Sequence, residues 1–481
     1  MDNLVRRATT GTIYAFLGSY AVTAINFIAG IILARILLPS HFGVFALAIF
    51  YLTVFSVLKD WGAESAILYR QDKEEETTST LFFLQVALSV LAIVLALISS
   101  FLLKKIYDPQ VVSILLVLAI FALVEALGAI PRTLLEKKIE FKTLSVLEAS
   151  ATFIAAAAAI FLAWQGFGVW ALVVQRISLI SLKTAGFWFT SRFRPIFAID
   201  KQILSWFFKN FGLPIFLSSL ASVFLFQFDN FLIGTFVGAV FLGYYSKAFQ
   251  FATLPTQLIT QVISRVAFPV YAKCQDDREK LAKAFTIFLK GIWRLSLPMA
   301  VGLFVLASDI IKLLIGEKWL PAVPLLRILA GYSLARILLD GTGPLFSGGL
   351  GKPKIRTKIA IIQAILLVFF ASIGVYFWRG TGVALAVDLV MLSGVFLSYQ
   401  QIQRDLKLNL GEIFLAPTLA VLGTLIVSTI IIYIIIVRSL FLTLIIRGIL
   451  LCLVYFGLLL ALEGSKLKKE AIVLLKYVRQ K

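Results

Sequence analysis

Ionisable side chains inside long apolar stretches are the residues of this sequence most able to do chemistry. Placing one charge at the centre of a bilayer costs about 2.5–3.5 kcal/mol on insertion scales, so such groups are expected in ion pairs or along a water-filled cavity. Arg can hold an anion there, since its guanidinium gives two parallel donors to phosphate oxygens. Ten basic and six acidic residues have this placement: Arg35, Arg176, Lys183, Lys247, Arg265, Lys290, Arg294, Arg327, Arg336 and Arg447, with Glu125, Glu148, Asp229, Asp309, Asp340 and Asp388.

These residues fall into two groups, those deep within a predicted span and those near its end. Arg176, Asp229 and Arg336 lie deep, where a functional cavity role and a structural ion pair remain equal alternatives. Asp229, in FQFDNF, would either pair with Arg265 or Arg336 or bind a coupling Na⁺ or H⁺, and Asp340 and Asp388 have the same two alternatives. Others lie within about two helical turns of a predicted end and can reach the interface: Lys183, Lys290, Arg294 and Asp309.

The sequence contains few residues in patterns that would support catalysis or metal binding. The only histidine is His41, at a predicted outer turn, where a surface role is expected. GGLGKPK (348–354) has Pro where a phosphate-binding loop needs Ser or Thr for Mg²⁺. Cys274 and Cys452 are too few for a disulfide or metal framework. We therefore predict no enzyme, no catalytic residue, no metal and no cofactor, with Na⁺ or H⁺ as the candidate coupling ion.

Composition identifies the elements that must position these charges. The 481 residues are 60% hydrophobic and 15% charged, with a mean hydropathy of +0.97, whereas soluble domains carry about 25% charge. The sequence predicts an all-α polytopic membrane protein whose first apolar run is an uncleaved span. At about 20 residues per span, the predicted helices number about fourteen: 11–38, 42–58, 81–103, 111–130, 143–164, 168–190, 210–236, 244–270, 285–311, 322–348, 359–378, 382–403, 412–436 and 440–462.

Lys and Arg in the connections predict the orientation. With the N-terminus inside, inner segments hold 29 of the 45 basic residues and outer segments hold 6. This excess predicts that both termini are cytoplasmic. The net charge of +20 then faces the anionic inner leaflet. Membrane lipids are therefore expected partners, and nucleic acid is not.

Two tight turns lie 200 residues apart. ILARILLPSHFGVFALA (32–48) and LIGTFVGAVFLGYYSKA (232–248) align without a gap and share Gly43/Gly243 and Ala48/Ala248. Six helices separate the turns, so the copies have one orientation, as in a parallel repeat. We predict two pseudo-symmetric six-helix lobes around a central cavity, 1–200 and 201–408, followed by two helices and a basic cytoplasmic tail in 409–481.

Several stretches carry a resemblance to a known family. ARILLPSHFGVFALA, WGAESAILYRQD (61–72), IPRTLLEKKIEFKTLSVLE (130–148) and GFGVWALVVQRI (166–177) resemble Wzx-type oligosaccharide flippases. These belong to the multidrug/oligosaccharidyl-lipid/polysaccharide exporter superfamily. In the second half, FDNFLIGTFVGAVFLGYYSKAFQFATLP (228–255), RVAFPVYAKCQDDREKLAKAF (265–285) and GEKWLPAVPLLRILA (316–330) are similar to the polysaccharide-transporter branch that includes colanic-acid-type exporters.

The resemblance implies a V-shaped fold and a flippase that moves a polyprenyl-diphosphate-linked oligosaccharide across the plasma membrane by alternating access. Such a substrate needs cations for its diphosphate and a polar lumen for its sugars. The diphosphate candidates are Arg35, Arg176, Lys247 and Arg336, and the candidates for stacking on sugars are Trp170, Tyr244, Tyr245 and Tyr332. We expect a monomer in the plasma membrane, with glycan-assembly enzymes as candidate partners at the inner loops.

Two other functions stay open. A cation-coupled multidrug or organic-cation antiporter has the same superfamily fold, but would favour an acidic cavity over ten basic and six acidic membrane charges. A membrane-embedded glycan polymerase or ligase would need a catalytic outer loop, whereas the predicted outer connections are about ten residues or fewer.

Overall fold

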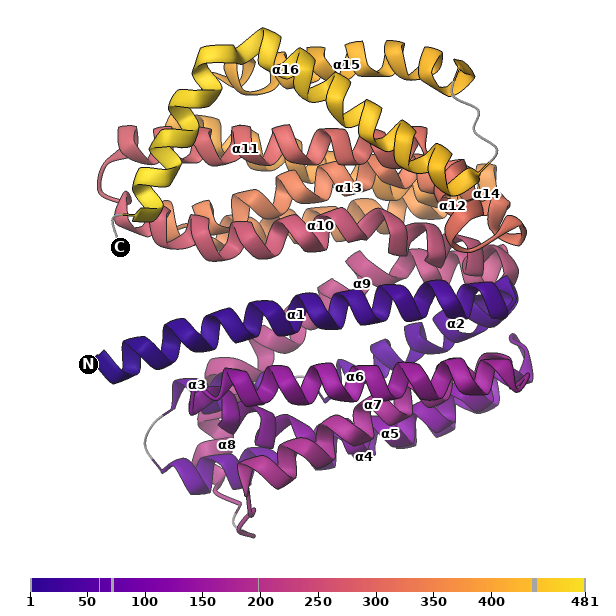
Figure 1. Ribbon diagram of the computed structural model, residues 1–481. Helices are drawn as coiled ribbons and strands as arrows, with labels where there is room; N and C mark the ends of the chain where they lie inside the picture. Colours follow the sequence, from indigo (N-terminus) through magenta and orange to yellow (C-terminus); the bar gives the residue numbers. More distant parts are fainter. Residues whose placement is uncertain (1, 60, 71–72, 198, 435–438, 480–481) are drawn as a thin grey trace. The chain divides into compact units, whose positions relative to one another are not determined.

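The computed structural model describes residues 2–59, 61–70, 73–197, 199–434 and 439–479. Within these ranges every regular element is a helix, so the predicted all-α class is confirmed (Figure 1). Contacts divide the chain into two compact units, Met1–Gly243 and Tyr244–Lys481. The predicted division into lobes at residues 200 and 408 rests on pseudo-symmetry and stays a prediction.

The first unit is a bundle of long helices. Helix α1 packs against α6, α6 against α7, and both α4 and α7 against α5, while α2 packs on α5 and α9. Short α3 and α8 close one end beside a π-helical segment, η1. The elements are α1 (Asp2–Ile36), α2 (Pro39–Ser56), α3 (Ala63–Tyr69), α4 (Glu74–Leu103), α5 (Pro109–Lys137), α6 (Phe141–Trp164), α7 (Val169–Ser191), α8 (Lys201–Phe207), η1 (Phe208–Gly212), α9 (Leu213–Phe236) and the first turn of α10 (Ala239–Lys273).

Hydroxyl groups at the start of α4 hold the segment between α7 and α8. Ser79 Oγ accepts a hydrogen bond from the backbone N–H of Ile196 at 3.0 Å, and Thr80 Oγ1 accepts one from Asp200 at 3.3 Å. Both hydroxyl-bearing side chains are buried. The connection 192–200 is therefore tied to the bundle by backbone groups that would otherwise lack partners.

Each predicted turn leaves two residues between its helices. Helix α1 ends at Ile36 and α2 begins at Pro39, and α9 ends at Phe236 and α10 begins at Ala239. The turns pack on each other reciprocally. A Cβ on Gly43 would overlap the backbone carbonyl of Ala239, and a Cβ on Gly243 would overlap that of Pro39. Residues 200 apart thus exchange places across the contact, which only glycine permits at this backbone spacing.

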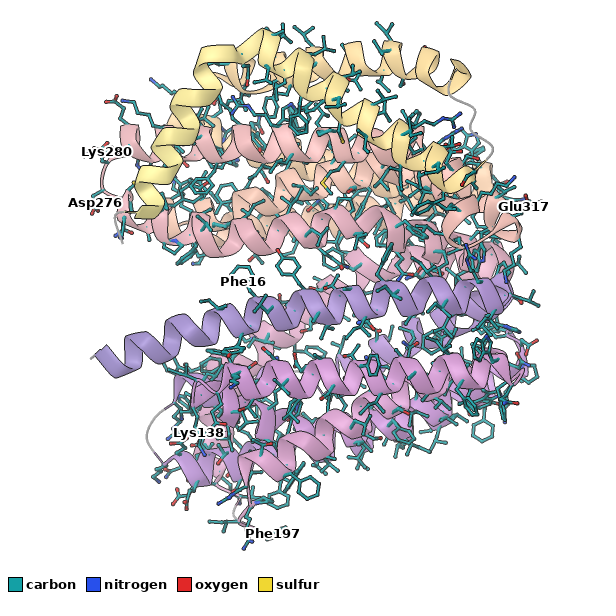
Figure 2. The ribbon with its side chains drawn as sticks, in the orientation of Figure 1. Phe16, Lys138, Phe197, Asp276, Lys280 and Glu317 are labelled. Carbon is teal, nitrogen blue, oxygen red and sulfur yellow. The ribbon has the colours of Figure 1, made fainter. Side chains whose placement is uncertain are left out.

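The second unit is built around α13. This helix packs against α11 and α14, while α15 and α16 pair with each other and lie on α11. Asp276 and Lys280 lie at one end of the unit and Glu317 at the other (Figure 2). Besides the rest of α10, its elements are α11 (Arg278–Val305), α12 (Ala307–Leu314), the 3₁₀ segment η2 (Glu317–Ala322), α13 (Val323–Pro344), the π-helical η3 (Leu345–Gly349), α14 (Pro353–Leu406), α15 (Leu410–Ile434) and α16 (Leu440–Arg479).

Asp277 caps the start of α11. Its carboxylate accepts hydrogen bonds from the backbone N–H groups of Lys280 at 3.0 Å and Glu279 at 3.1 Å. These hydrogen bonds, with the ammonium of Lys280, hold the pKa of Asp277 below its usual value. The cap fixes the start of α11 at Arg278, seven residues before the predicted start at 285, because the Asp277 cap lies ahead of the apolar run.

Helix α14 is a hairpin of two helices. Trp378 and Arg379 leave the helical region, and the backbones of Gly374 and Gly382 touch. Residues eight apart would be about 12 Å apart in a straight helix, so the chain reverses here. The predicted helices 359–378 and 382–403 are its two arms.

Apolar helices in the structure can be compared with the fourteen predicted membrane crossings. Eleven helices in the described part are long and apolar enough to cross a membrane, with α14 counted once and α7 and α10 not among them. Each of the fourteen predicted ranges lies mainly on a helical segment. The count of fourteen crossings and the cytoplasmic placement of both termini stay predictions.

Ion pairs attach α15 and α16 to the rest of the second unit. Lys290 contacts Glu412 at 2.8 Å, Arg294 contacts Glu463 at 2.6 Å, and Arg447 contacts Asp309 at 2.7 Å. Lys290, Arg294 and Asp309, which the sequence placed within reach of the membrane interface, are each held in an ion pair instead. Their charged groups are mostly buried, because an opposite charge offsets the cost of leaving water.

Candidate functional site

A charged cluster in the first unit joins three helices. Arg176 in α7 contacts Glu125 in α5 at 3.2 Å, and Lys59, just after α2, contacts the other oxygen of Glu125 at 2.7 Å. Helix α5 supplies the middle residue because it packs against both α2 and α7. One carboxylate therefore faces two cations, and the cluster keeps a surplus positive charge.

The cluster is partly open. The side chains of Arg176 and Glu125 are 37% and 43% exposed, although each lies well inside a long apolar helix. Exposed charges at that depth must face water, since contact with lipid tails would cost several kcal/mol. The Nε of Arg176 is buried and has no hydrogen-bond partner within the described residues. The hydrogen bond to Glu125 uses one N–H of the exposed end of the guanidinium, so that end retains donors for an anionic ligand.

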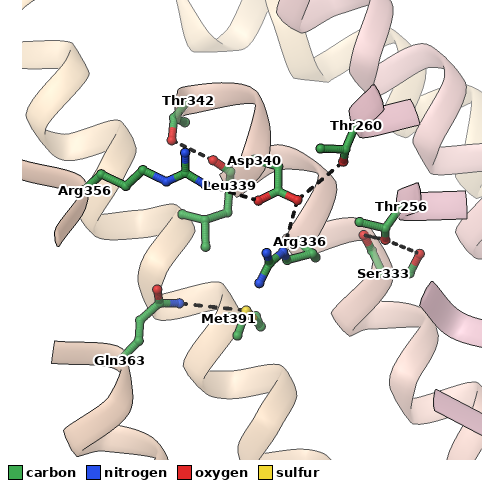
Figure 3. Close-up of polar contacts among 10 residues, drawn as sticks. All are labelled: Thr256, Thr260, Ser333, Arg336, Leu339, Asp340, Thr342, Arg356, Gln363 and Met391. Atoms are coloured by element: carbon green, nitrogen blue, oxygen red, sulfur yellow. Dashed lines mark hydrogen bonds and ion pairs between the residues drawn. The ribbon is translucent and has the colours of Figure 1, made fainter. Parts of the chain in front are cut away.

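The second unit holds a cluster of the same type (Figure 3). Arg336 and Asp340 lie one turn apart on α13 and contact each other at 3.1 Å, and Arg356 at the start of α14 approaches Asp340 at 3.8 Å. Thr260 of α10 donates a hydrogen bond to the same carboxylate at 3.4 Å. Again two cations share one carboxylate.

Sequence reasoning missed two members of these clusters. Lys59 and Arg356 follow or precede apolar runs and were counted as inner-loop charges. Lys59 is only 12% exposed, because the turn after α2 directs it onto Glu125. Arg356 extends from the first turn of α14 to Asp340. The detectable signal was their distance of about one turn from an apolar run, within reach of a long side chain.

The three acidic candidates differ in their surroundings. Asp340 is ion-paired, as above. Asp229 is buried and its Oδ1 accepts a hydrogen bond from the N–H of Asn230 at 2.9 Å, while the side chain of Arg265 lies outside the described residues. Asp388, on the second arm of α14, accepts a hydrogen bond from the backbone N–H of Tyr332. Its Oδ1 is buried without a hydrogen-bond partner in the described part of the chain.

The remaining basic candidates differ in their exposure to solvent. Arg35 is exposed in the last turn of α1. Lys247 is 5% exposed and donates a hydrogen bond to Gln250 Oε1 at 2.9 Å. Their role in binding a diphosphate stays a prediction.

The aromatic candidates are also unequal. Tyr245 and Tyr332 are buried and both pack on Phe249, with ring centroids 5.8 and 4.8 Å away. They present no open ring face in this structure. Tyr244 is partly exposed beside Trp319, and Trp170 is 37% exposed at the start of α7. Stacking on sugars stays a prediction for all four.

Comparison with known sequences shows the family. A family model described as "Polysaccharide biosynthesis protein" matches residues 32–324, more than half of the chain. Teichuronic acid biosynthesis protein TuaB of Bacillus subtilis is 28% identical over 368 residues, 75% of each protein. Lipopolysaccharide biosynthesis protein WzxC of Escherichia coli is 24% identical over 404 residues, 82% of this chain and 81% of that protein.

Solved structures show the fold. The lipid II flippase MurJ in an inward closed conformation superposes with a TM-score of 0.74 at 18% identity, covering 95% of this chain and 100% of MurJ. A multidrug resistance MATE family transporter of the MOP superfamily gives a TM-score of 0.64 at 17% identity, over 81% of this chain and 96% of the transporter. TuaB and WzxC are named for biosynthesis pathways, and the two solved structures for a flippase and a transporter.

Its apolar helices and this fold make the chain a multi-pass protein of the plasma membrane. The matched residues 32–324 include both repeated turns and helix α7, which carries Arg176. The chain belongs to the polysaccharide biosynthesis protein family.

Proposed function

We propose that this protein is a flippase that moves a polyprenyl-diphosphate-linked oligosaccharide across the plasma membrane, for the assembly of a cell-surface polysaccharide. Family membership and the names of relatives such as WzxC support the polysaccharide pathway. The likeness to the lipid II flippase MurJ supports the fold. We further propose that the protein works as a monomer by alternating access. Glycan-assembly enzymes on the inner side would supply its substrate.

The observation that carries the proposal is the surplus positive charge of both clusters. Lys59 and Arg176 face one carboxylate, and so do Arg336 and Arg356. A diphosphate diester is an anion, and Arg binds phosphate oxygens through two parallel hydrogen bonds. A cluster with more cations than carboxylates favours such a headgroup once it leaves water.

Substitution of one arginine in each cluster tests the proposal. We expect Arg176→Ala and Arg336→Ala each to abolish export of the glycan, with lipid-linked oligosaccharide accumulating in the inner leaflet because synthesis continues. Lys at either position should restore export only in part, since it keeps the charge but loses the planar pair of donors. The measurement is surface polysaccharide together with the lipid-linked intermediate.

Abundance must be controlled, because removing one partner of an ion pair between helices can also destabilise the fold. Arg192→Ala is a matched control: Arg192 follows α7, the helix of Arg176, and lies outside the cluster. Normal export by both cluster variants at normal abundance would refute the cationic clusters as the diphosphate site.

The antiporter is the second candidate on the same fold. The MATE transporter supports it at the level of fold alone. The clusters argue against it, because an organic cation would meet two positive side chains at each carboxylate. If the arginine variants export normally, the antiporter becomes the better proposal.

We also propose that Asp388 binds the coupling ion, H⁺ or Na⁺. Its Oδ1 is buried without a partner in the described residues, which is costly for a bare carboxylate. A proton or a small cation on this oxygen would remove that cost. Asp340 is less suited, since two arginines already neutralise it.

A further inference from the structure

A pocket of about 460 Å³ opens at the turn-bearing end of the first unit. Its walls come from the start of α2, the connection between α4 and α5, the end of α9 and the start of α10. Six polar residues line it: Ser40, His41, Tyr107, Asp108, Gln110 and Thr235. The charge distribution of the sequence predicts that this end lies outside the cell.

One wall of the pocket is held in place by a chain of hydroxyl groups. Tyr51 donates a hydrogen bond to the hydroxyl of Tyr107 at 2.9 Å, and Tyr107 lies 2.6 Å from the hydroxyl of Thr235. Three elements, α2, the 104–108 connection and α9, are thereby linked. These two hydrogen bonds fix the side chain of Tyr107, which lines the pocket.

Other polar groups of the pocket have unused hydrogen-bonding capacity. Within the described residues, the hydroxyl of Ser40 and the side-chain amide of Gln110 have no hydrogen-bond partner, and only one oxygen of Asp108 has one, the N–H of Gln110 at 2.8 Å. A hydroxyl, an amide and a carboxylate oxygen together supply both donors and acceptors. Such a set matches a ligand with many hydroxyl groups.

The lining argues against other ligand classes. No Lys or Arg lines the pocket and one carboxylate does, which disfavours an anion. No group of three metal-ligating side chains occurs in the described chain. An acyl chain would leave six polar side chains without water. The volume lies within the range of about 300–1,000 Å³ typical of small-ligand pockets.

We propose that this pocket is a saccharide-binding site that receives sugar units of the glycan at the outer end of the protein. The proposal rests on the proposed flippase function and adds a second contact for the substrate, separate from the cations that hold its diphosphate. Gln110 and Ser40 donate to and accept from sugar hydroxyls, and Asp108 accepts from them.

Cysteine protection on the purified full-length protein tests the pocket. Gln110→Cys and Gln165→Cys are made with Cys274 and Cys452 replaced by Ala. Gln165 is the matched control, an exposed glutamine in another predicted outer connection and not part of the pocket lining. The probe is the oligosaccharide released by mild acid from the cell's own lipid-linked intermediates, at millimolar concentration.

We expect the probe to slow maleimide labelling at position 110 several-fold and to leave position 165 unchanged. In cells, Gln110→Ala should slow export several-fold and Gln165→Ala should not. Equal labelling at position 110 with and without the probe overturns the pocket. The proposed flippase function still stands after that result if Arg176→Ala blocks export. Normal export by the arginine variants would instead reject the clusters as the diphosphate site, whatever the pocket binds.

Discussion

At the scale of single residues, the molecule places two cations around each of two carboxylates. Glu125 and Asp340 each neutralise part of the charge that Lys59, Arg176, Arg336 and Arg356 bring into the membrane. Complete neutrality would remove the attraction for a phosphate, and four unpaired cations would be costly to insert. The observed ratio leaves attraction for an anion while limiting that cost.

Asp388 gives the prediction at this scale. Asn has nearly the same shape but exchanges no proton and binds Na⁺ weakly, so Asp388→Asn should reduce export at least about tenfold, since the orphaned oxygen would no longer load its ion. The remaining export should no longer respond to external pH or Na⁺. Export measured across both gradients checks this.

Asp276→Asn serves as the control, because Asp276 is an exposed acid at the end of the second unit (Figure 2). It should leave export and its ion dependence unchanged. An Asp388→Asn protein that exports normally and keeps both responses would exclude Asp388 as the coupling residue.

At the scale of elements, the two turns at 37–38 and 237–238 form a reciprocal contact. Gly43 lies against the backbone of Ala239 and Gly243 against that of Pro39. The sequence echo therefore has a physical cause, because both glycines allow the same approach of two backbones.

Substitution of these glycines should have matching effects. A side chain at either position meets backbone atoms that cannot rotate away, so Gly43→Leu and Gly243→Leu should both impair export to a similar degree while most protein remains inserted. Gly302→Leu is the control, since nothing lies within 4 Å of a Cβ there. Loss at one turn with full activity at the other would show that the two contacts are not equivalent in function.

At the scale of the whole molecule, membrane orientation decides what each end of a unit meets. With Cys274 and Cys452 replaced by Ala, Gln165→Cys should react with an impermeant thiol reagent on intact cells, whereas Glu75→Cys and Lys354→Cys should react only after permeabilisation. All three positions are exposed. This result follows from the excess of basic residues in inner segments.

Ser79 would be a poor reporter of the same inner connection, because its side chain is 1% exposed and would not react from either side. Labelling of Lys354→Cys on intact cells would reverse the predicted orientation. It would also move the saccharide pocket to the inner face.

The helices, the two turns and the presence of charge within the membrane were predictable from the sequence. Apolar runs, Pro and Gly at turns, and the placement of Lys and Arg are local properties, and membrane insertion responds to them directly. The hairpin within α14 lies where the sequence predicted it. The turns were predicted at 38–42 and 237–243 but are shorter, because α2 begins at Pro39 and α10 at Ala239.

Only the tertiary structure decided which charges meet. Lys59 and Glu125 are 66 residues apart, and Arg447 and Asp309 are 138 apart. Their pairing depends on how α2 packs on α5 and α16 on α12, which local patterns do not encode. His41 and Gln110 likewise became neighbours in one pocket because the start of α2 meets the start of α5. Ion pairs and pockets arise from side chains on different helices, so their geometry appears only when the helices are packed.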